Sequence, residues 1–359
     1  MLIKYLGSKK KLLDSISQCV GSFPEVTSVM DLFSGTSRVG HALKTRGYQV
    51  FANDHNAYAS TLARCYVQAD LDEWNKEATQ IIRELNSLSG QPGYFTETFC
   101  ENARYFQPKN GERIDAIREE IAKKDLHPEL EAIVLVSLME AADRVDSTTG
   151  VQMAFLKKWA QRSFNDLEMR VPALVPRSPN GKSSATQLDA IDAVHSLSAD
   201  VAYIDPPYNQ HSYLGNYHIW ETLVLWDKPE VYGIANKRTD VRTRKSVYNS
   251  KPAFKKAFEQ LLRSVRAKGM VISFSDEGYI SRDEMVEIVN SLYDGKASVS
   301  VVTHDYKRYV GAQIGIHDLT GKRVGEVSHL RNSEFLFVVS GPDFPSDIQA
   351  LQEEIPTLF

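Results

Sequence analysis

Short apolar runs alternate with amphipathic segments toward both ends of the chain. Six runs have the length of strands and lie at residues 29–33, 48–52, 201–204, 270–274, 299–303 and 335–339. After the first run, Val39, Ala42 and Leu43 recur at helical spacing up to Gly47. Strands that alternate with helices in this way predict an α/β fold, with a doubly wound sheet that binds ligands at the carboxyl ends of its strands.

A helix start can be read near the end of the chain. Ser281 and Glu284 have the spacing of a capping box, in which each side chain bonds to the backbone of the other residue. Behind them, apolar residues recur at helical spacing. We therefore predict a helix that begins directly after Ser281.

Two segments do not follow the alternation. Residues 70–185 are mainly helical, with an amphipathic run at 114–122 and an apolar run at 133–139, and between Asp70 and Glu140 they hold 15 acids against 8 bases. The second segment, residues 209–256, is basic, and from Lys237 to Lys256 eight basic residues face one acid. Because like charges repel and little apolar surface anchors it, we expect the basic part to be mobile without a partner.

These segments suggest a division of the chain. We predict a sheet domain made of residues 1–69 and 186–359, into which the basic segment 209–256 is inserted, and a mainly helical insertion at 70–185. No repeat or flexible linker separates the parts. We therefore expect the insertions to pack against the sheet.

Composition and charge are those of an ordinary globular enzyme. The 359 residues carry 42 Lys and Arg against 46 Asp and Glu, a formal charge of -4, so nucleic-acid contacts must come from local clusters. The three cysteines, Cys19, Cys65 and Cys100, share no metal-binding spacing and are expected to be buried free thiols in a reducing compartment. The His residues show no ligand spacing, so we expect no metal site.

The chain offers no segment typical of a membrane protein. Its most apolar stretch, residues 132–142, is interrupted by Ser137 and Glu140 and falls well short of the ~20 residues that a membrane span needs. The N-terminal residues are rich in lysine and do not resemble a secretory signal. The expected location is the cytoplasm, without membrane contact.

The first candidate site follows the first predicted strand. Asp31, Phe33 and Gly35 lie where a strand meets a turn and the start of a helix, so that backbone N–H groups can approach a ligand closely. Asp54, after the next strand, is placed to accept hydrogen bonds from ribose hydroxyls. Ser37 stands where a dinucleotide fingerprint would have a further glycine. At this point a plain tight turn, a nicotinamide dehydrogenase and other nucleotide-binding proteins all remain open.

The second candidate site is more specific. Asp205, Pro206, Pro207 and Tyr208 follow an apolar strand, and proline fixes φ and lacks an N–H group. The Asp205 carboxylate and the Pro206 carbonyl can then act as two acceptors for one amino group on a flat ring that stacks on Tyr208. Two such hydrogen bonds draw the amino hydrogens out of the ring plane and localise the nitrogen lone pair. This is what an exocyclic amine needs before it attacks an electrophile.

Taken together, the motifs resemble a known family. The resemblance rests on the order of five segments, which runs Lys4-Tyr5-Leu6-Gly7-Ser8-Lys9, Asp31 to Gly35, Asp54, Asp205 to Tyr208 and Ser273 to Ser281. This order is similar to that of the D12-class (Dam-like, alpha-group) adenine-N6 DNA methyltransferases, and in particular of FokI-type restriction–modification methyltransferases. Residues 140–146 and 216–218 extend the resemblance, and the region from about 70 to 130 carries the least of it.

The resemblance implies a Rossmann-like methyltransferase sheet with S-adenosylmethionine as cofactor. Residues from five segments would bind the cofactor, namely Tyr5, Lys9, the turn with Asp31, Phe33 and Gly35, the ribose acid Asp54, Asp189 and Asp205. Asp205, Pro206, Pro207 and Tyr208 would be catalytic. The chain departs from Dam-like members at Tyr5, where a Trp is common, and at Ser8, where a Gly is common. Neither change removes a group that the reaction needs.

Double-stranded DNA is the partner that the resemblance implies, with the target adenine flipped out of the stack. The insertion at 70–185 would supply most of the target recognition, and one face with Arg104, Lys109 and Arg113 would meet DNA. In the basic segment, the residues expected to contact phosphates are Lys237, Arg238, Arg242, Arg244 and Lys245. A cognate restriction endonuclease that acts on the same site is a further implied partner, and we expect a monomer or weak dimer.

Alternatives remain at this point. Methylation of cytosine N4, or of adenine N6 in RNA, uses the same amino-group chemistry. A catalytically silent DNA-binding regulator could keep the fold. His211 and His218 could act as general bases, but a proton that leaves a methylated ammonium can pass to Asp205 or water. We therefore predict that these His residues lie on the surface or contact DNA.

Overall fold

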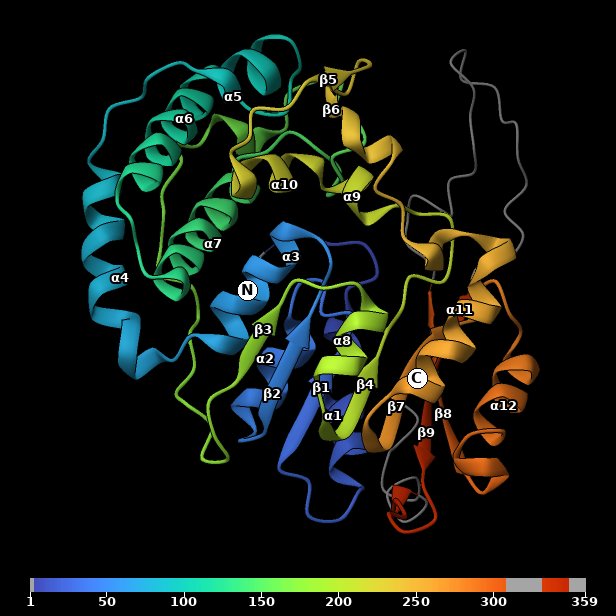
Figure 1. The fold of residues 1–359 in the computed structure, drawn as a ribbon. Helices are drawn as coiled ribbons and strands as arrows, with labels where there is room; N and C mark the ends of the chain where they lie inside the picture. The colour runs from blue at the N-terminus through green and yellow to red at the C-terminus, as the bar shows by residue number, and fades with distance from the viewer. Residues whose placement is uncertain (1–2, 308–330, 349–359) are drawn as a thin grey trace.

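A seven-stranded sheet forms the centre of the computed structural model, with the strand order β3-β2-β1-β4-β7-β9-β8 (Figure 1). The structure describes residues 3–307 and 331–348, so residues 308–330 and 349–359 of the predicted segment 186–359 lie outside the described residues. The strands are β1 (Ser28–Asp31), β2 (Gln49–Asn53), β3 (Ser184–Thr186), β4 (Ala199–Ile204), β7 (Ala267–Ser275), β8 (Ser298–Lys307) and β9 (Arg331–Ser340). β9 is antiparallel to β7 and β8, and the other neighbours are parallel. The predicted α/β fold with a Rossmann-like sheet is confirmed.

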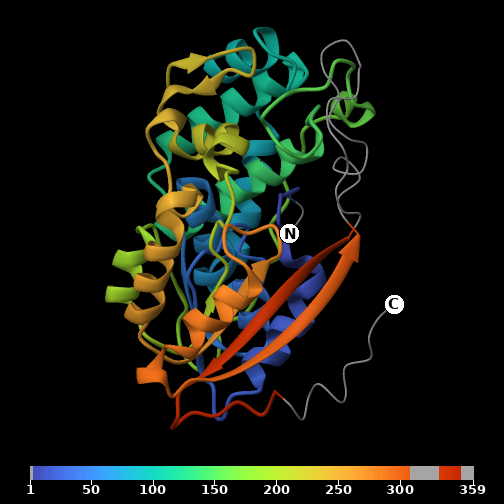
Figure 2. The same cartoon turned by 90° about the vertical axis from the view of Figure 1, so that its right-hand side faces the viewer.

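The direction in which the chain crosses the sheet reverses between β1 and β4. β1 pairs with β2 on one side and with β4 on the other, both parallel. Such a switch point leaves a crevice at the carboxyl ends of the two central strands, which is where open α/β sheets bind ligands. β8 and β9 lie beyond β7 and form a long antiparallel pair at the edge of the sheet (Figure 2).

All six predicted strands are present, within a few residues of the expected ends. The capping box at Ser281 is also confirmed, because both of its reciprocal hydrogen bonds form at the start of α12 (Arg282–Asn290). The sheet has one strand beyond these six. β3 lies at the end of the segment 70–185, which was expected to be the helical insertion, and it pairs with β2 in register with Phe51 to Asn53. The expected boundary at residue 185 therefore falls inside a strand of the sheet, whose three residues are of intermediate exposure.

Helices cover both faces of the sheet. On one face, α8 (Ala190–Ser196), α11 (Lys251–Ser264) and α12 share an apolar core with β4, β7 and β9. On the other face, α1 (Leu13–Gly21) and α2 (Arg38–Thr45) bury their apolar sides against the sheet. Short 3-10 turns connect these elements, including η1 (Lys9–Leu12), η5 (Thr239–Arg242) and η6 (Val247–Asn249).

The helical part of the protein combines residues 70–183 with residues 213–238 (Figure 1) and has a separate apolar core. Its helices are α4 (Leu71–Asn86), α5 (Tyr94–Thr96), α6 (Pro108–Lys123), α7 (Pro128–Arg144), α9 (Tyr213–Asn216) and α10 (His218–Leu225), and α3 (Ala57–Ala63) contributes to the same core. α9 and α10 come from the basic segment 209–256, which was expected to be inserted in the sheet domain. The Arg118 guanidinium of α6 joins them by donating hydrogen bonds to the carbonyls of Leu223 (2.9 Å) and Val224 (3.0 Å).

The basic segment is therefore folded into the protein. After α10 it forms a hairpin of β5 (Val231–Tyr232) and β6 (Lys237–Arg238), and the Tyr105 hydroxyl of the helical part donates a hydrogen bond to the hairpin carbonyl of Ala235 (3.0 Å). Tyr248, further along, is buried. The expectation of an unanchored basic loop is wrong, because buried aromatic and ionic contacts hold it.

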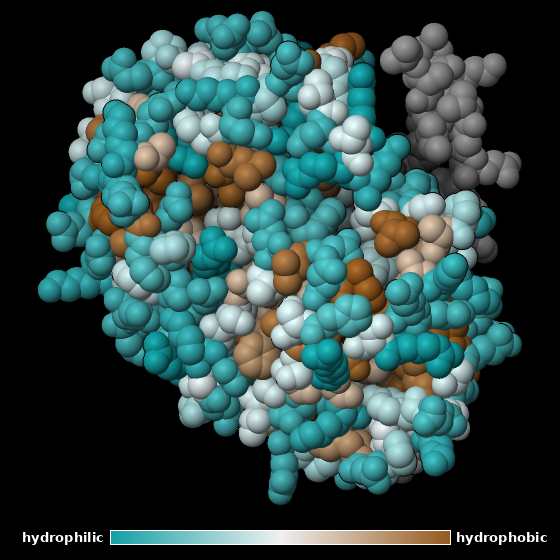
Figure 3. Space-filling view, in the orientation of Figure 1, coloured by the Kyte–Doolittle hydropathy of each residue, from teal (hydrophilic) through white to brown (hydrophobic). Residues whose placement is uncertain are grey.

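The surface in the view of Figure 3 is largely hydrophilic, with apolar side chains in separate patches. Cys19, Cys65 and Cys100 are buried free thiols, as predicted. Among the described residues, no helix has the length and apolar character to cross a membrane.

Candidate active site

A pocket opens at the carboxyl ends of β1, β2 and β4. Its walls come from the N-terminal segment, the turn after β1, the end of β2, the start of α8, the tetrapeptide after β4 and the basic segment. All eight residues predicted to bind the cofactor line this one pocket: Tyr5, Lys9, Asp31, Phe33, Gly35, Asp54, Asp189 and Asp205. The structure thus brings together residues from distant parts of the chain.

The turn after β1 is tight and left-handed at two positions. Gly35 has φ +53°, which favours glycine, and Ser37, the N-cap of α2, has φ +59°. A non-glycine residue in this conformation carries strain, which concentrates at functional sites. The Ser37 hydroxyl lies 3.1 Å from the Ser34 hydroxyl, within hydrogen-bond distance. Ser37, which replaces the glycine of the dinucleotide fingerprint, therefore adopts the left-handed backbone conformation that glycine favours.

Asp31, at the end of β1, is buried with one oxygen unused. Its Oδ2 accepts hydrogen bonds from the Ser34 hydroxyl (3.1 Å) and the Gly40 amide (3.0 Å). Within the described part of the chain, Oδ1 has no hydrogen-bond partner. Burial raises the pKa of this carboxyl to about 7. A ligand with a donor or a positive charge would satisfy this oxygen.

Asp54, after β2, is tied to the same turn. Its Oδ2 accepts a hydrogen bond from the Gly35 amide (3.0 Å), and its Oδ1 accepts one from the Asn56 amide (3.0 Å). Among the described residues, the buried Asn56 Oδ1 lacks a partner, and Asn56 lines the pocket. Asp189 is exposed and caps α8 by accepting from the Ile191 amide (3.1 Å). The pocket therefore offers several acceptors, which suits a ligand with hydroxyl and amino groups.

Asp205 continues directly from the buried strand β4. The ammonium of Lys9 lies 3.2 Å from Asp205 Oδ1 and also forms an ion pair with Glu334. Burial raises the pKa of Asp205 to about 6, with the nearby Glu334 raising it further and Lys9 opposing both. Lys9, predicted to contact the cofactor, therefore also holds the carboxylate of the tetrapeptide.

The tetrapeptide loop is held by its neighbours. The Tyr279 amide donates a hydrogen bond to the Tyr208 carbonyl (3.0 Å), and the Asn249 side chain donates one to the Asn209 carbonyl (2.8 Å). The Tyr208 ring packs against Phe274 with 5.2 Å between ring centroids. These contacts fix the loop before any substrate arrives.

Tyr5 closes the pocket from the N-terminal side. Its ring stacks on Tyr217 and Tyr213, with centroid distances of 4.5 Å and 5.3 Å, and its hydroxyl lies 3.1 Å from that of Tyr58. The Tyr217 hydroxyl also accepts a hydrogen bond from the Leu6 amide (2.6 Å). Tyr at position 5 thus gains a hydroxyl contact that a Trp could not make in the same way.

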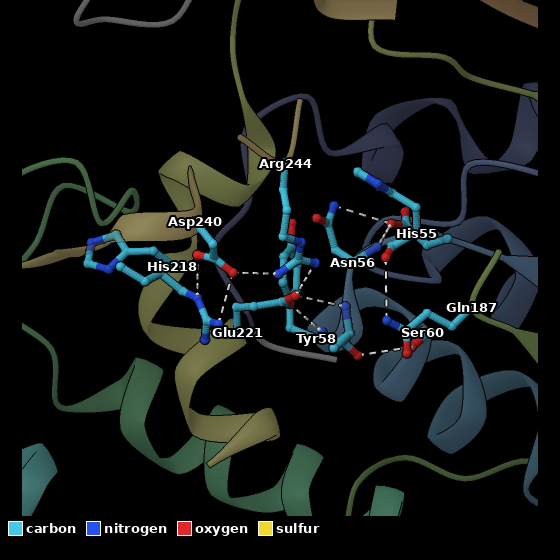
Figure 4. Close-up of polar contacts among 12 residues, drawn as sticks. His55, Asn56, Tyr58, Ser60, Gln187, His218, Glu221, Asp240 and Arg244 are labelled. Atoms are coloured by element: carbon cyan, nitrogen blue, oxygen red, sulfur yellow. Dashed lines mark hydrogen bonds and ion pairs between the residues drawn. The ribbon is translucent and has the colours of Figure 1, made fainter. Parts of the chain in front are cut away.

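A buried acid connects the basic segment to the pocket, as Figure 4 shows. Glu221 of α10 is fully buried, and its carboxylate accepts hydrogen bonds from the amides of Ala57 (3.2 Å) and Tyr58 (2.9 Å) at the start of α3. The same carboxylate pairs with Arg244 at 2.7 Å, and Arg244 also pairs with Asp240 at 3.1 Å. Glu221 therefore caps the helix that follows the Asp54 turn, and Arg244 compensates its buried charge.

The structure separates the basic residues predicted to bind phosphates. Arg238 is buried and pairs with Asp227 (2.7 Å) and Asp240 (2.8 Å), so its predicted phosphate contact is wrong. Arg244 lines the pocket and is held by two acids. Lys237 is partly exposed, whereas Arg242 and Lys245 are exposed. Arg242 lies over the Tyr232 ring at 3.9 Å from its centroid.

Other sequence predictions also differ from the structure. His218 is buried, its Nε2 bonds with the Gln152 carbonyl (2.9 Å), and burial lowers its pKa to about 3, so it does not lie on the surface. His211 is exposed, as predicted. Arg113 donates to two backbone carbonyls and Lys109 pairs with Asp166 (2.5 Å), so both are engaged within the protein, while Arg104 is exposed.

Two residues at the site were not found from the sequence. Glu221 lies within an apolar segment and Glu334 directly precedes one, and each is buried beside a basic side chain. A lone acid within or next to an apolar run is a weak indication of such a role. The basic partners, Lys9 for Glu334 and Arg244 for Glu221, are not adjacent in the sequence, so only the fold identifies them.

The chain is similar to known proteins over most of its length. A family model described as D12 class N6 adenine-specific DNA methyltransferase matches residues 5–288. The chain is 30% identical over 322 residues to the Type II methyltransferase M.NlaIII of Neisseria lactamica, which covers 86% of this chain and 92% of that protein. It is 31% identical over 308 residues to the Type II methyltransferase M.FokI of Planomicrobium okeanokoites, covering 80% of this chain and 47% of that protein.

A viral relative shows the same extent of similarity. Type II methyltransferase M.CviAII of Paramecium bursaria Chlorella virus 1 is 29% identical over 316 residues, with 84% of this chain and 91% of that protein covered. The chain thus spans nearly all of M.NlaIII and M.CviAII and about half of M.FokI. The family match covers the N-terminal segment, the turn after β1 and the tetrapeptide alike. The chain belongs to the D12 class of N6 adenine-specific DNA methyltransferases.

Proposed function

We propose that this protein transfers a methyl group from S-adenosylmethionine to N6 of an adenine in double-stranded DNA, as the modification enzyme of a restriction–modification system. The observation that carries the proposal is the position of Asp205, which lies at the end of β4 and lines the same pocket as Asp31 and Asp54. A methyl donor and an amino acceptor bound there would meet at one edge of the sheet. The relatives' names support the restriction–modification setting.

The pocket suits S-adenosylmethionine on chemical grounds. The unpartnered Oδ1 of buried Asp31 would accept from its methionine amino group, and Asp54 and Asn56 would hold the ribose hydroxyls. Gly35 lets the backbone approach the ligand, and Asp189 stands at the edge where the adenine would lie. The bound cofactor supplies a methyl group activated by its sulfonium charge.

The chain's own contribution is to position and activate the amine. Asp205 and the Pro206 carbonyl would each accept a hydrogen bond from the N6 amino group, while the target ring stacks on Tyr208. The base must leave the duplex, because its amino group is otherwise paired, and extrusion costs a few kcal/mol. Once the methyl group is bound to nitrogen, the proton that leaves would pass to Asp205 or to water.

DNA would be held by two surfaces. Arg242, Lys245 and Lys237 are the residues of the predicted phosphate-binding set that keep exposed charge, so they would contact the backbone without reading sequence. The helical part, which combines residues 70–183 with α9, α10 and the β5–β6 hairpin, would recognise the target site. We further propose a monomer or weak dimer that works in the cytoplasm beside a restriction endonuclease for the same site.

The decisive experiment measures methyl transfer from labelled S-adenosylmethionine to DNA and identifies the product nucleoside by mass spectrometry. The expected product is N6-methyl-2′-deoxyadenosine. N4-methyl-2′-deoxycytidine would instead indicate a cytosine-N4 DNA methyltransferase, and methylated RNA would indicate an adenine-N6 RNA methyltransferase. Asp205→Ala is expected to abolish the transfer. If this variant methylates adenine at the wild-type rate, or if the wild-type protein transfers no methyl group, the proposal fails.

A further inference from the structure

Glu334 is a buried acid that lies next to Lys9, behind the tetrapeptide and outside the lining of the pocket. It lies on β9 with 3% of its surface exposed, opposite Ser275 in the antiparallel pairing with β7. β7 is in turn the neighbour of β4, the strand that ends at Asp205. The sheet therefore places an acid from β9 beside the tetrapeptide.

Glu334 contacts the groups that hold Asp205. Its carboxylate forms an ion pair with the Lys9 ammonium and accepts a hydrogen bond from the Ser273 hydroxyl (2.9 Å). The same ammonium lies 3.2 Å from Asp205 Oδ1 and 5.8 Å from the centre of the Tyr208 ring. Lys9, itself 7% exposed, thus joins Glu334 to the catalytic carboxylate.

We infer that Glu334 is a positioning residue for methyl transfer, which acts by fixing the Lys9 ammonium on Asp205 Oδ1 so that Asp205 Oδ2 stays available to the target amine. A lysine ammonium has three donors on a flexible stem, and with a single carboxylate partner it can move to cover both oxygens. A second anchor, itself fixed by Ser273, limits this movement. The inference rests on the proposed function of Asp205.

A purely structural role does not account for this arrangement. Buried ion pairs are often no more stabilising than apolar residues of the same size, because the charges lose their hydration. Among the described residues, Asp205 and Glu334 share the Lys9 ammonium beside the tetrapeptide, an arrangement that is better explained by positioning than by stability. A displacement of a catalytic group by about 1 Å can lower the reaction rate by a factor of roughly 10².

The test is single-turnover methyl transfer by Glu334→Gln at saturating DNA and S-adenosylmethionine. This variant keeps the size of the side chain and removes the charge, and its rate is expected to fall roughly 10- to 100-fold. The Kd values for S-adenosylmethionine and DNA should stay at the wild-type level, since Glu334 is not among the residues that line the pocket. Ser273→Ala removes only one hydrogen bond to Glu334 and should give a smaller loss of rate in the same direction.

A matched control separates positioning from stability. Asp200→Asn also removes an acid from an ion pair on the sheet, with Lys268 (2.9 Å), at the opposite end of β4. It is expected to lower thermal stability without changing the transfer rate. If Glu334→Gln is insoluble, Ser273→Ala still tests the inference through the transfer rate.

A double-mutant cycle tests whether Glu334 acts through Lys9. In a Lys9→Gln background, the further change Glu334→Gln should leave the transfer rate unchanged, because the group that it positions is gone. Rate losses that multiply, or a wild-type rate in Glu334→Gln or Ser273→Ala alone, overturn the inference while the proposed function stands. A wild-type protein that transfers no methyl group overturns the proposed function, and this inference with it.

Discussion

The Lys9 ammonium lies 3.2 Å from Oδ1 of Asp205, so that the N-terminal segment and the catalytic tetrapeptide meet in one ion pair. Burial works to lower the pKa of Lys9, but the adjacent Asp205, Tyr208 and Glu334 raise it well above its usual range. Lys9 is therefore charged at neutral pH. Its charge favours the ionised form of Asp205, the group that would receive the target amine.

The pH dependence of the reaction follows from this pair. Burial raises the pKa of Asp205 to about 6, and only the ionised carboxylate keeps both oxygens as acceptors, one for Lys9 and one for the amine. The transfer rate is therefore expected to fall as pH decreases through about 6. Lys9 opposes the shift, so Lys9→Gln should move the acid limb to higher pH. Single-turnover rates across the pH range locate the limb in both proteins, and an unmoved limb in Lys9→Gln contradicts the assignment.

Asp31 should make stability depend on pH. Burial raises its pKa from 3.8 to about 7, so the unfolded chain loses this proton at lower pH than the folded protein does. The free energy of unfolding should then decrease as pH rises from about 4 through 7. In Asp31→Asn this part of the slope disappears, and the affinity for S-adenosylmethionine falls roughly tenfold because a charged hydrogen bond is removed. Denaturant unfolding at several pH values measures the first effect, and calorimetric titration with S-adenosylmethionine measures the second. If Asp31→Asn leaves the pH dependence of the free energy of unfolding unchanged, the assignment of that dependence to Asp31 is wrong.

The exposed basic residues should govern DNA affinity without affecting the fold. Neutralising Lys237, Arg242 and Lys245 together is expected to weaken binding to specific and unrelated DNA alike. The slope of log affinity against log salt should flatten by ~0.9 for each DNA phosphate that the variant no longer neutralises. The measurement is a salt titration of DNA binding.

Arg238→Gln is the matched control for that variant. It removes one basic charge from the same segment, but a buried one that pairs with Asp227 and Asp240. It is expected to destabilise the protein by about 1–2 kcal/mol, because buried hydrogen bonds to two carboxylates are lost while the carboxylates themselves remain partly exposed to water. If the slope of log DNA affinity against log salt is the same for the triple variant and the wild type, Lys237, Arg242 and Lys245 do not bind DNA phosphates.

Sequence preference should move with the helical part as a unit. Residues 70–183 bond through Arg118 to the carbonyls of Leu223 and Val224, so exchanging them alone with those of a relative removes a packed interface. That chimera is expected to be unstable. Exchange of 70–183 together with 213–238 should give a folded enzyme with the relative's target sequence, mapped by sequencing of modified bases. A folded chimera that keeps the original target would place recognition elsewhere.

The sequence by itself determined the framework of this protein. Short apolar runs and apolar residues at helical spacing mark the segments that become buried, so six strands of the sheet and the capping box at Ser281 were predictable from local pattern. The order of the turn with Gly35, the acid Asp54 and the tetrapeptide at Asp205 was enough to indicate the family. Gly35, Asp54 and Asp205 each follow a parallel strand, and the carboxyl ends of parallel strands lie at the same edge of a sheet, so their common position was also predictable.

Only the tertiary structure decided which charges meet. Glu334 reaches Lys9 because β9 enters the sheet beside β7, although the two residues are 325 positions apart in the sequence. Arg238 lies in a basic segment, so its local sequence is typical of a residue that binds phosphate. Its burial depends on how the β5–β6 hairpin packs against α10, where its guanidinium lies 3.4 Å from the Thr222 hydroxyl, and this packing cannot be predicted from the segment alone.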